Sequence, residues 1–130
     1  MLDYLIIGLG GALGTMGRYW LGAAVGRHVA TFPLGTMLIN ISGSFVIAFF
    51  SALTMPDGRW MVSARGRAFF MTGICGGYTT FSSFSLQTLN LVQDREWLYA
   101  GLNVVLSVVL CLVAAWLGYI AGASLRNKGG

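Results

Sequence analysis

The chain has 130 residues, of which 56% are hydrophobic and only 9% are charged, and its formal net charge is +4. An average soluble domain carries about a quarter charged residues, so these few charges cannot cover the exterior of a soluble fold of this size. We therefore expect an integral membrane protein in contact with the lipid bilayer, and no nucleic-acid partner, because the basic residues form no stripe.

Four stretches of the chain are apolar over the length of about 20 residues that a helix needs to cross a bilayer. We predict an all-α, four-helix integral membrane protein that forms a single transmembrane domain over residues 1–130. The predicted spans cover residues of about 2–25, 34–54, 68–92 and 97–125. Short polar connections join them around Arg27-His28, Pro56-Asp57-Gly58-Arg59 and Asp94-Arg95-Glu96.

Arg18, in the first span, is the only ionisable residue well inside any span. Burying a charge in a bilayer costs at least about 2.5 kcal/mol, so its side chain should face protein or water. Two interpretations stay open: the guanidinium bonds to carbonyls or reaches the interface, or it attracts anions into a vestibule. Glycines spaced four residues apart further predict close helix packing at Gly10/Gly14, Gly22/Gly26, Gly73/Gly77 and Gly118/Gly122.

Polar residues recur every four positions in the second and fourth spans, and so lie along one face of each helix. They are Thr36, Asn40 and Ser44 in the second span and Asn103, Ser107 and Cys111 in the fourth. Each stripe could serve only to hold neighbouring helices together, through interhelical hydrogen bonds that each contribute about 0.6 to 2 kcal/mol. Amides and hydroxyls can also donate hydrogen bonds to an anion and replace the water that it sheds, as a selective pore requires.

The third span contains the polar run Gly76-Gly77-Tyr78-Thr79-Thr80-Phe81-Ser82-Ser83-Phe84-Ser85. Glycine costs about 1 kcal/mol in a helix and hydroxyls compete for backbone hydrogen bonds, so we predict that the helix breaks here. Irregular backbone at this depth must be buried in protein or line a watery cavity, and its freed carbonyls suit a dehydrated cation. Phe81 and Phe84 share a helical face, either as core or lipid-facing side chains or as rings whose positive edges line an anion path.

Carboxylates are absent from the predicted membrane core, because the acidic residues are Asp3, Asp57, Asp94 and Glu96. A proton-coupled exporter of drugs or cations would need such a carboxylate, which counts against that alternative. A second alternative is an assembly or scaffold subunit, in which Asn40, Phe81 and Phe84 would be replaceable. No nucleophile, base and orienting group can be assembled, so we expect no enzyme. Cys75 and Cys111 are expected to be buried free thiols.

Three motifs together resemble a known family. They are Gly14-Thr15-Met16-Gly17-Arg18 in the first span, Gly35-Thr36 followed by Asn40 and Gly43 in the second, and the run from Gly76 to Ser85 in the third. In order and spacing they are similar to the small bacterial fluoride channels called Fluc or CrcB-type channels. The four-span layout matches over nearly the whole chain, and the third motif is the most specific.

The resemblance implies a fluoride-selective ion channel in the bacterial plasma (inner) membrane, with several passes through the bilayer. Weakly acidic HF enters the cell and dissociates, and fluoride then leaves the cytoplasm passively, which protects against fluoride toxicity. Members of the family are antiparallel, dual-topology homodimers with two parallel pores and a structural sodium ion (Na+) at the dimer centre.

The resemblance also assigns roles to particular residues. Those similar to the fluoride pathway are Asn40, Phe81, Phe84, Thr36 and Ser107. Arg18 would serve as a vestibule or structural charge, and the backbone carbonyls of Gly76 and Thr79, given by both subunits, would hold the sodium ion. On the fourth helix the family often carries hydroxyl or aromatic groups where this chain has Asn103 and Cys111.

Overall fold

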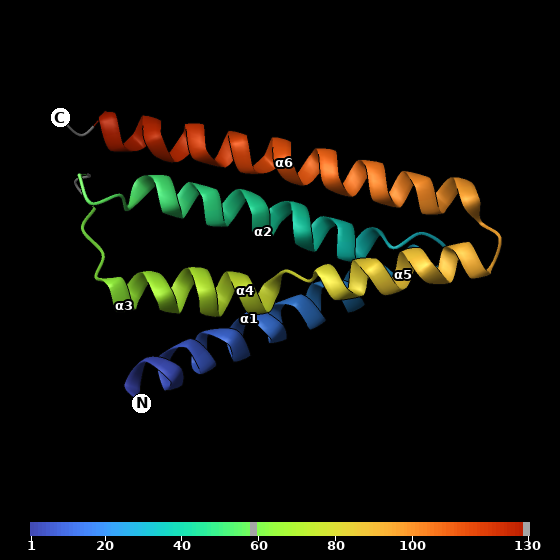
Figure 1. The fold of residues 1–130 in the computed structure, drawn as a ribbon, viewed down its shortest axis with the longest axis horizontal. Helices are drawn as coiled ribbons and strands as arrows, with labels where there is room; N and C mark the ends of the chain where they lie inside the picture. The colour runs from blue at the N-terminus through green and yellow to red at the C-terminus, as the bar shows by residue number, and fades with distance from the viewer. Residues whose placement is uncertain (58–59, 129–130) are drawn as a thin grey trace.

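The computed structural model describes residues 1–57 and 60–128, which form long helices and no strand (Figure 1). The all-α class predicted from the sequence is therefore confirmed. The helices are α1 Leu2–Gly26, α2 Leu34–Leu53, α3 Ala64–Arg67, the π-helix η1 Ala68–Cys75, α4 Gly76–Tyr78, α5 Phe81–Gln93 and α6 Trp97–Asn127. The predicted polar connection at Gly58 and Arg59 lies outside the described residues.

Two of the helices, α2 and α6, are long and apolar enough to cross a membrane. Within the chain, only 22% of the most apolar window of α2 and 17% of that of α6 are buried. The core helix of a soluble protein would be mostly buried, so these apolar faces are suited to lipid or to another protein chain. That all four predicted stretches cross the bilayer, as one transmembrane domain, stays a prediction.

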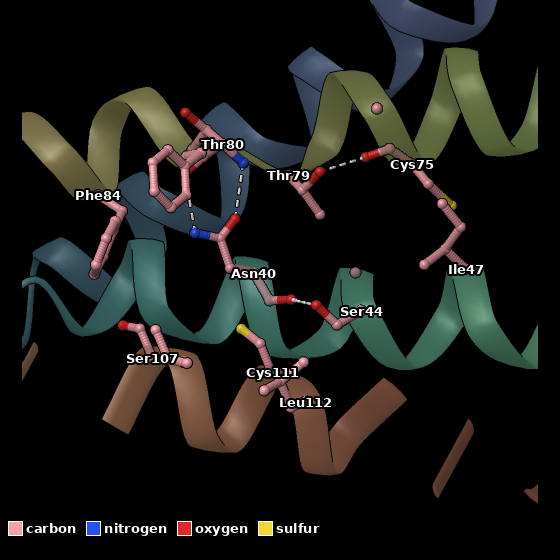
Figure 2. A pocket seen from close by; sticks show the side chains of 14 residues that line it. Asn40, Ser44, Ile47, Cys75, Thr79, Thr80, Phe84, Ser107, Cys111 and Leu112 are labelled. Carbon is pink, nitrogen blue, oxygen red and sulfur yellow. Dashed lines mark hydrogen bonds between the residues drawn. The ribbon is translucent and has the colours of Figure 1, made fainter. Parts of the chain in front are cut away.

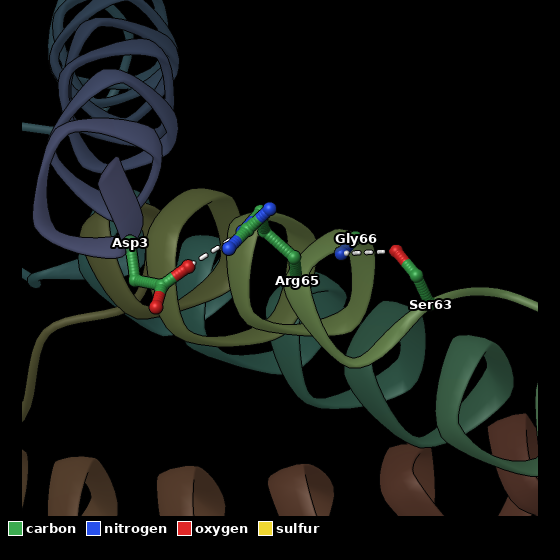
Figure 3. Close-up of polar contacts among 4 residues, drawn as sticks. All are labelled: Asp3, Ser63, Arg65 and Gly66. Carbon is green, nitrogen blue, oxygen red and sulfur yellow. Dashed lines mark hydrogen bonds and ion pairs between the residues drawn. The ribbon is translucent and has the colours of Figure 1, made fainter.

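The third apolar stretch consists of two helical parts. The first begins after Ser63, whose hydroxyl oxygen accepts the Gly66 N–H at 3.1 Å (Figure 3), and continues through α3, η1 and α4. Thr79 and Thr80 then adopt extended backbone, with φ/ψ of −77°/156° and −152°/109°. α5 follows directly, and Figure 1 shows the link between α4 and α5 as irregular chain. The helical part begins before the predicted residue 68, because the Ser63 cap lies upstream of the apolar run.

Glycines let two pairs of helices approach each other closely. α1 packs against η1 and α4, and a Cβ added at Gly10 would lie 3.0 Å from the Cα of Gly73. α6 packs along α2, and a Cβ added at Gly118 would lie 3.2 Å from the Cα of Phe45. The prediction of close packing is wrong at Gly26, where an added Cβ would meet nothing within 4 Å. It is confirmed at Gly10/Gly14, Gly73/Gly77 and Gly118/Gly122.

Arginines join the helices at the end of the bundle that holds the start of α1 and the end of α6 (Figure 1). Arg65 Nε donates to Asp3 Oδ1 at 2.6 Å, which links α3 to α1 (Figure 3). Arg67 Nη1 donates to the Thr54 carbonyl at 2.8 Å, and Arg126 donates to another carbonyl near the end of α2. Because the last carbonyls of a helix lack intrahelical donors, these contacts satisfy the end of α2.

Candidate functional site

A cavity of about 390 Å³, here called the inner cavity, lies between α2, the interrupted third stretch and α6 (Figure 2). Its lining combines polar side chains, two phenylalanine rings and aliphatic side chains. The polar and aromatic residues include Asn40, Ser44, Thr79, Thr80, Phe81, Phe84, Ser107 and Cys111, and the aliphatic ones are Ile47, Val108 and Leu112. The break between α4 and α5 therefore forms part of the cavity wall.

A second cavity of about 570 Å³, here called the outer cavity, lies between α1, α2, α5 and the connection that precedes α2. Its polar lining includes Arg18, Thr36, Thr80, Ser83, Gln87 and Asp94. Thr80 lines both cavities, so both spaces lie against the same residue of the break.

The side-chain amide of Asn40 forms hydrogen bonds with the backbone at the break in the third stretch. Its Nδ2 donates to the Thr80 carbonyl at 3.0 Å, and its Oδ1 accepts the Thr80 N–H at 2.7 Å (Figure 2). The amide thus gives the Thr80 N–H an acceptor in place of the Gly76 carbonyl. It also gives a second donor to the Thr80 carbonyl, which as the N-cap carbonyl accepts the first hydrogen bond of α5. One hydrogen of Nδ2 remains for another acceptor, since an Asn side chain carries two.

The backbone carbonyls that precede the break lose their regular helical donors, and those of Gly76 and Thr79 are among them. The N–H of Thr80, which would reach the Gly76 carbonyl in a continuous helix, goes to Asn40 instead. The N–H of Ser83, which would reach the Thr79 carbonyl, goes to the Thr80 hydroxyl at 3.1 Å as a helix cap. Unwound carbonyls are typical ligands of sodium in membrane proteins, so the chemistry of Gly76 and Thr79 suits such an ion.

Phe81 and Phe84 pack against each other at the start of α5. Their ring centroids lie 5.3 Å apart, with an angle of 45° between the ring planes. Phe84 is half-buried, whereas Phe81 is 77% exposed in the single chain. Because the edge of an aromatic ring is positive, these rings can attract an anion weakly without a fixed counter-charge.

The polar stripe of α6 contacts both the inner cavity and α5. Ser107 Oγ donates to Asn103 Oδ1 at 3.3 Å, and Asn103 Nδ2 donates to Thr88 Oγ1 on α5 at 2.9 Å.

Cys75 and Cys111 are both free thiols. The expectation of burial holds for Cys75 but is wrong for Cys111, which is half-buried because it lines the inner cavity.

Comparisons with known proteins identify the family. The family described as CrcB-like protein, Camphor Resistance (CrcB), matches residues 5–119. The chain belongs to this family. A relative from Opitutus terrae, named fluoride-specific ion channel FluC, is 59% identical over 128 residues, which cover 98% of this chain and 97% of the relative. A relative of the same name from Rhodospirillum rubrum is 57% identical over 129 residues, which cover 98% of this chain and 99% of the relative.

Membership of the CrcB family confirms the resemblance predicted from the three motifs. The relatives are named as ion channels and not as enzymes, which confirms that this chain is not an enzyme. Together with the apolar helices α2 and α6, the family indicates a membrane protein.

The structure of this CrcB-family chain places the predicted site residues on the two cavities. Those on the inner cavity are Asn40, Phe81, Phe84, Ser107, Gly76 and Thr79. Those on the outer cavity are Arg18 and Thr36. What each residue does there stays a prediction. Sequence reasoning missed Thr80, although a threonine directly before an apolar residue such as Phe81 is a signal for a helix N-cap.

Proposed function

We propose that the chain is a fluoride-selective ion channel through which fluoride leaves the cytoplasm passively across the bacterial plasma (inner) membrane, which protects the cell against fluoride toxicity. One observation carries the proposal: two cavities share Thr80, and no charged residue is among the described residues that line the inner one. The names of relatives that are similar over nearly their whole length support fluoride as the ion.

In the proposed path the anion first enters the outer cavity. The guanidinium of Arg18 attracts it there, and Thr36 offers a hydroxyl. Beyond the break, the remaining Nδ2 hydrogen of Asn40 and the edges of Phe81 and Phe84 replace part of the water shell. These groups hold an anion less tightly than a fixed positive charge would, so the ion is able to leave again.

We further propose that each chain crosses the bilayer four times and that two chains, inserted in opposite directions, form an antiparallel homodimer with two pores. Phe81 and Gly76 are exposed in the single chain, and a second copy would cover them. The carbonyls that one chain offers at the break include those of Gly76 and Thr79, and a second copy would double the oxygen ligands. A sodium ion, when bound there, neutralises the partial negative charge of these carbonyls.

The positions of the carboxylates support passive transport over proton-coupled export. They are exposed and lie at helix ends or in connections, at Asp3, Asp57, Asp94 and Glu96. A proton-coupled exporter needs a carboxylate that takes up and releases protons inside the membrane.

The proposal is tested with purified protein in liposomes loaded with fluoride or with chloride. We expect rapid fluoride efflux, followed with an ion-selective electrode, and almost no chloride efflux, because Asn40 and the ring edges offer few contacts to a larger anion. Equal release of the two anions would contradict the proposal, and so would liposomes that retain fluoride.

The variant Phe81→Ile separates a pore role from simple packing. It keeps an apolar side chain but removes the ring edge, so fluoride efflux should fall by at least about tenfold, which corresponds to about 1.4 kcal/mol. The matched control is Phe45→Ile, because Phe45 stacks on Phe49 on α2 and lines neither cavity. Undiminished efflux in Phe81→Ile would remove the ring from the pathway.

A further inference from the structure

A chain of hydrogen bonds links the inner cavity to the backbone of α5. Ser107 Oγ donates to Asn103 Oδ1 at 3.3 Å, and Asn103 Nδ2 donates to Thr88 Oγ1 at 2.9 Å. Thr88 Oγ1 in turn donates to the Phe84 carbonyl at 2.8 Å. Asn103 is only 2% exposed, so water does not compete for its amide. Both ends of the chain, Ser107 and Phe84, line the inner cavity.

The direction of these hydrogen bonds is fixed from the α5 end. The carbonyl of Phe84 only accepts, so the Thr88 hydroxyl gives its hydrogen to it and has only an acceptor left. Asn103 must therefore turn its Nδ2 toward Thr88, which leaves Oδ1 facing Ser107. As a result, Ser107 gives its hydrogen to Asn103 and not to the cavity.

The orientation of the Ser107 hydroxyl disfavours the binding of an anion in the inner cavity. An anion in the inner cavity is attracted by the hydrogen of a hydroxyl and repelled by its lone pairs. To bind at Ser107, it must draw the hydrogen away from Asn103, and the bond that is broken is long at 3.3 Å and hence weak. This competition with Asn103 lowers the affinity of the anion for Ser107 but does not prevent binding.

We propose that Asn103 is a positioning residue, which together with Thr88 sets the orientation of the Ser107 hydroxyl and so keeps fluoride weakly held in the inner cavity. The inference rests on the proposed function, since it names how one cavity residue meets the permeating ion. Conduction requires that an ion is bound well enough to enter and weakly enough to leave, and Asn103 shifts this balance toward release.

The decisive variant is Thr88→Val, which has nearly the shape of threonine but no hydroxyl. The Asn103 amide then has no acceptor for Nδ2 at Thr88, and a buried N–H without a partner is less tolerated than a buried carbonyl. The amide is expected to turn its Nδ2 toward Ser107, whose hydrogen then points into the cavity. Thr88 itself lines neither cavity, so the substitution leaves the lining residues unchanged.

The readout is the fluoride concentration that gives half-maximal efflux from liposomes. In Thr88→Val this concentration should fall about fivefold, because the anion no longer has to break a hydrogen bond before it binds. The maximal rate should fall as well, since release becomes slower. Thr88→Ser retains the hydroxyl and should restore the wild-type value. Asn103→Leu, which removes the acceptor of Ser107 directly, should shift the concentration in the same direction.

The Ser107→Ala background separates this role from a structural one. If Thr88 and Asn103 act through the Ser107 hydroxyl, Thr88→Val changes the half-maximal concentration by less than about twofold when Ser107 is alanine. An equal shift in both backgrounds would overturn the proposal, as would an unchanged or higher concentration in Thr88→Val alone. Failure of the wild-type protein to release fluoride would instead contradict the proposed function.

Discussion

Asn40 serves two purposes with one amide group. Its oxygen and one N–H hold the backbone of Thr80, and the side chain also lines the inner cavity with one N–H to spare. The nitrogen is needed for both purposes, because it donates to the Thr80 carbonyl and is the source of the remaining hydrogen. A change of this single atom therefore affects the break and the cavity together.

We predict that Asn40→Asp abolishes most transport. The carboxylate has no hydrogen for the Thr80 carbonyl, and its negative charge repels an anion in a poorly hydrated cavity. Fluoride efflux should fall by more than about tenfold. The melting temperature in detergent should also fall, because a carboxylate oxygen would face the Thr80 carbonyl where the amide now donates a hydrogen bond. The matched control is Asn127→Asp at the exposed end of α6. Normal efflux from Asn40→Asp liposomes would contradict this role.

The residue types of the site could be predicted from the sequence, but their partners could not. Asn40 and Ser107 stand out because they recur with polar neighbours on one face of an apolar helix. That Asn40 binds Thr80 depends on how α2 packs against the third stretch, forty positions away in the chain. The pairing of Asn103 with Thr88 likewise depends on the contact between α5 and α6.

At the scale of the elements, the third stretch differs most from the expectation. Its glycines and hydroxyls predict where regular helix is lost, and the extended residues Thr79 and Thr80 lie inside the predicted run. The π-helix η1 before it was not predicted, because Ala68–Cys75 is apolar apart from Thr72 and one polar position does not reveal the helical period. The other boundaries follow the apolar stretches to within a few residues.

We predict that Gly14→Ala destabilises the packing of α1 on the third stretch. A Cβ at Gly14 would collide with the carbonyl oxygen of Ile74 and lie 2.8 Å from the Tyr78 nitrogen, and both belong to the backbone, which cannot turn away. The free energy of unfolding should fall by about 1 to 3 kcal/mol, measured by thermal or denaturant unfolding in detergent. Gly8→Ala, on the same helix with nothing within 4 Å, is the control and should not lower stability. Equal stability of the two variants would contradict the close approach.

At the scale of the whole molecule, the two ends of the bundle differ. One end is joined by arginines that reach Asp3 and the end of α2, whereas the outer cavity opens beside the connection between α1 and α2. The break lies between these ends, with exposed Phe81 and Gly76 beside it. Most charges lie at the ends of the apolar stretches, as the sequence predicts, whereas Arg18 lies within α1 and lines the outer cavity.

We predict that sodium supports the assembled protein. If the carbonyls of Gly76 and Thr79 bind this ion between two copies, replacing sodium by the larger cation N-methylglucamine should lower fluoride efflux or the stability of the dimer. Efflux and size-exclusion elution are measured in both salts at equal ionic strength, with fluoride gradients held constant. Identical behaviour in the two salts would exclude the cation site while leaving the anion pathway untouched.

Because η1 is a π-helix, the number of residues in this segment matters as much as their identity. A π-helix closes its hydrogen bonds one residue further along than an α-helix does. Deleting one residue between Ala68 and Cys75 would let this segment rewind as ordinary α-helix. Because the two helix types turn the chain by different angles per residue, the rewound segment would present Gly76 in a different orientation even though no lining residue had been exchanged. Homologous chains of slightly different length should therefore place their insertions and deletions in the connections and keep the number of residues in η1 constant.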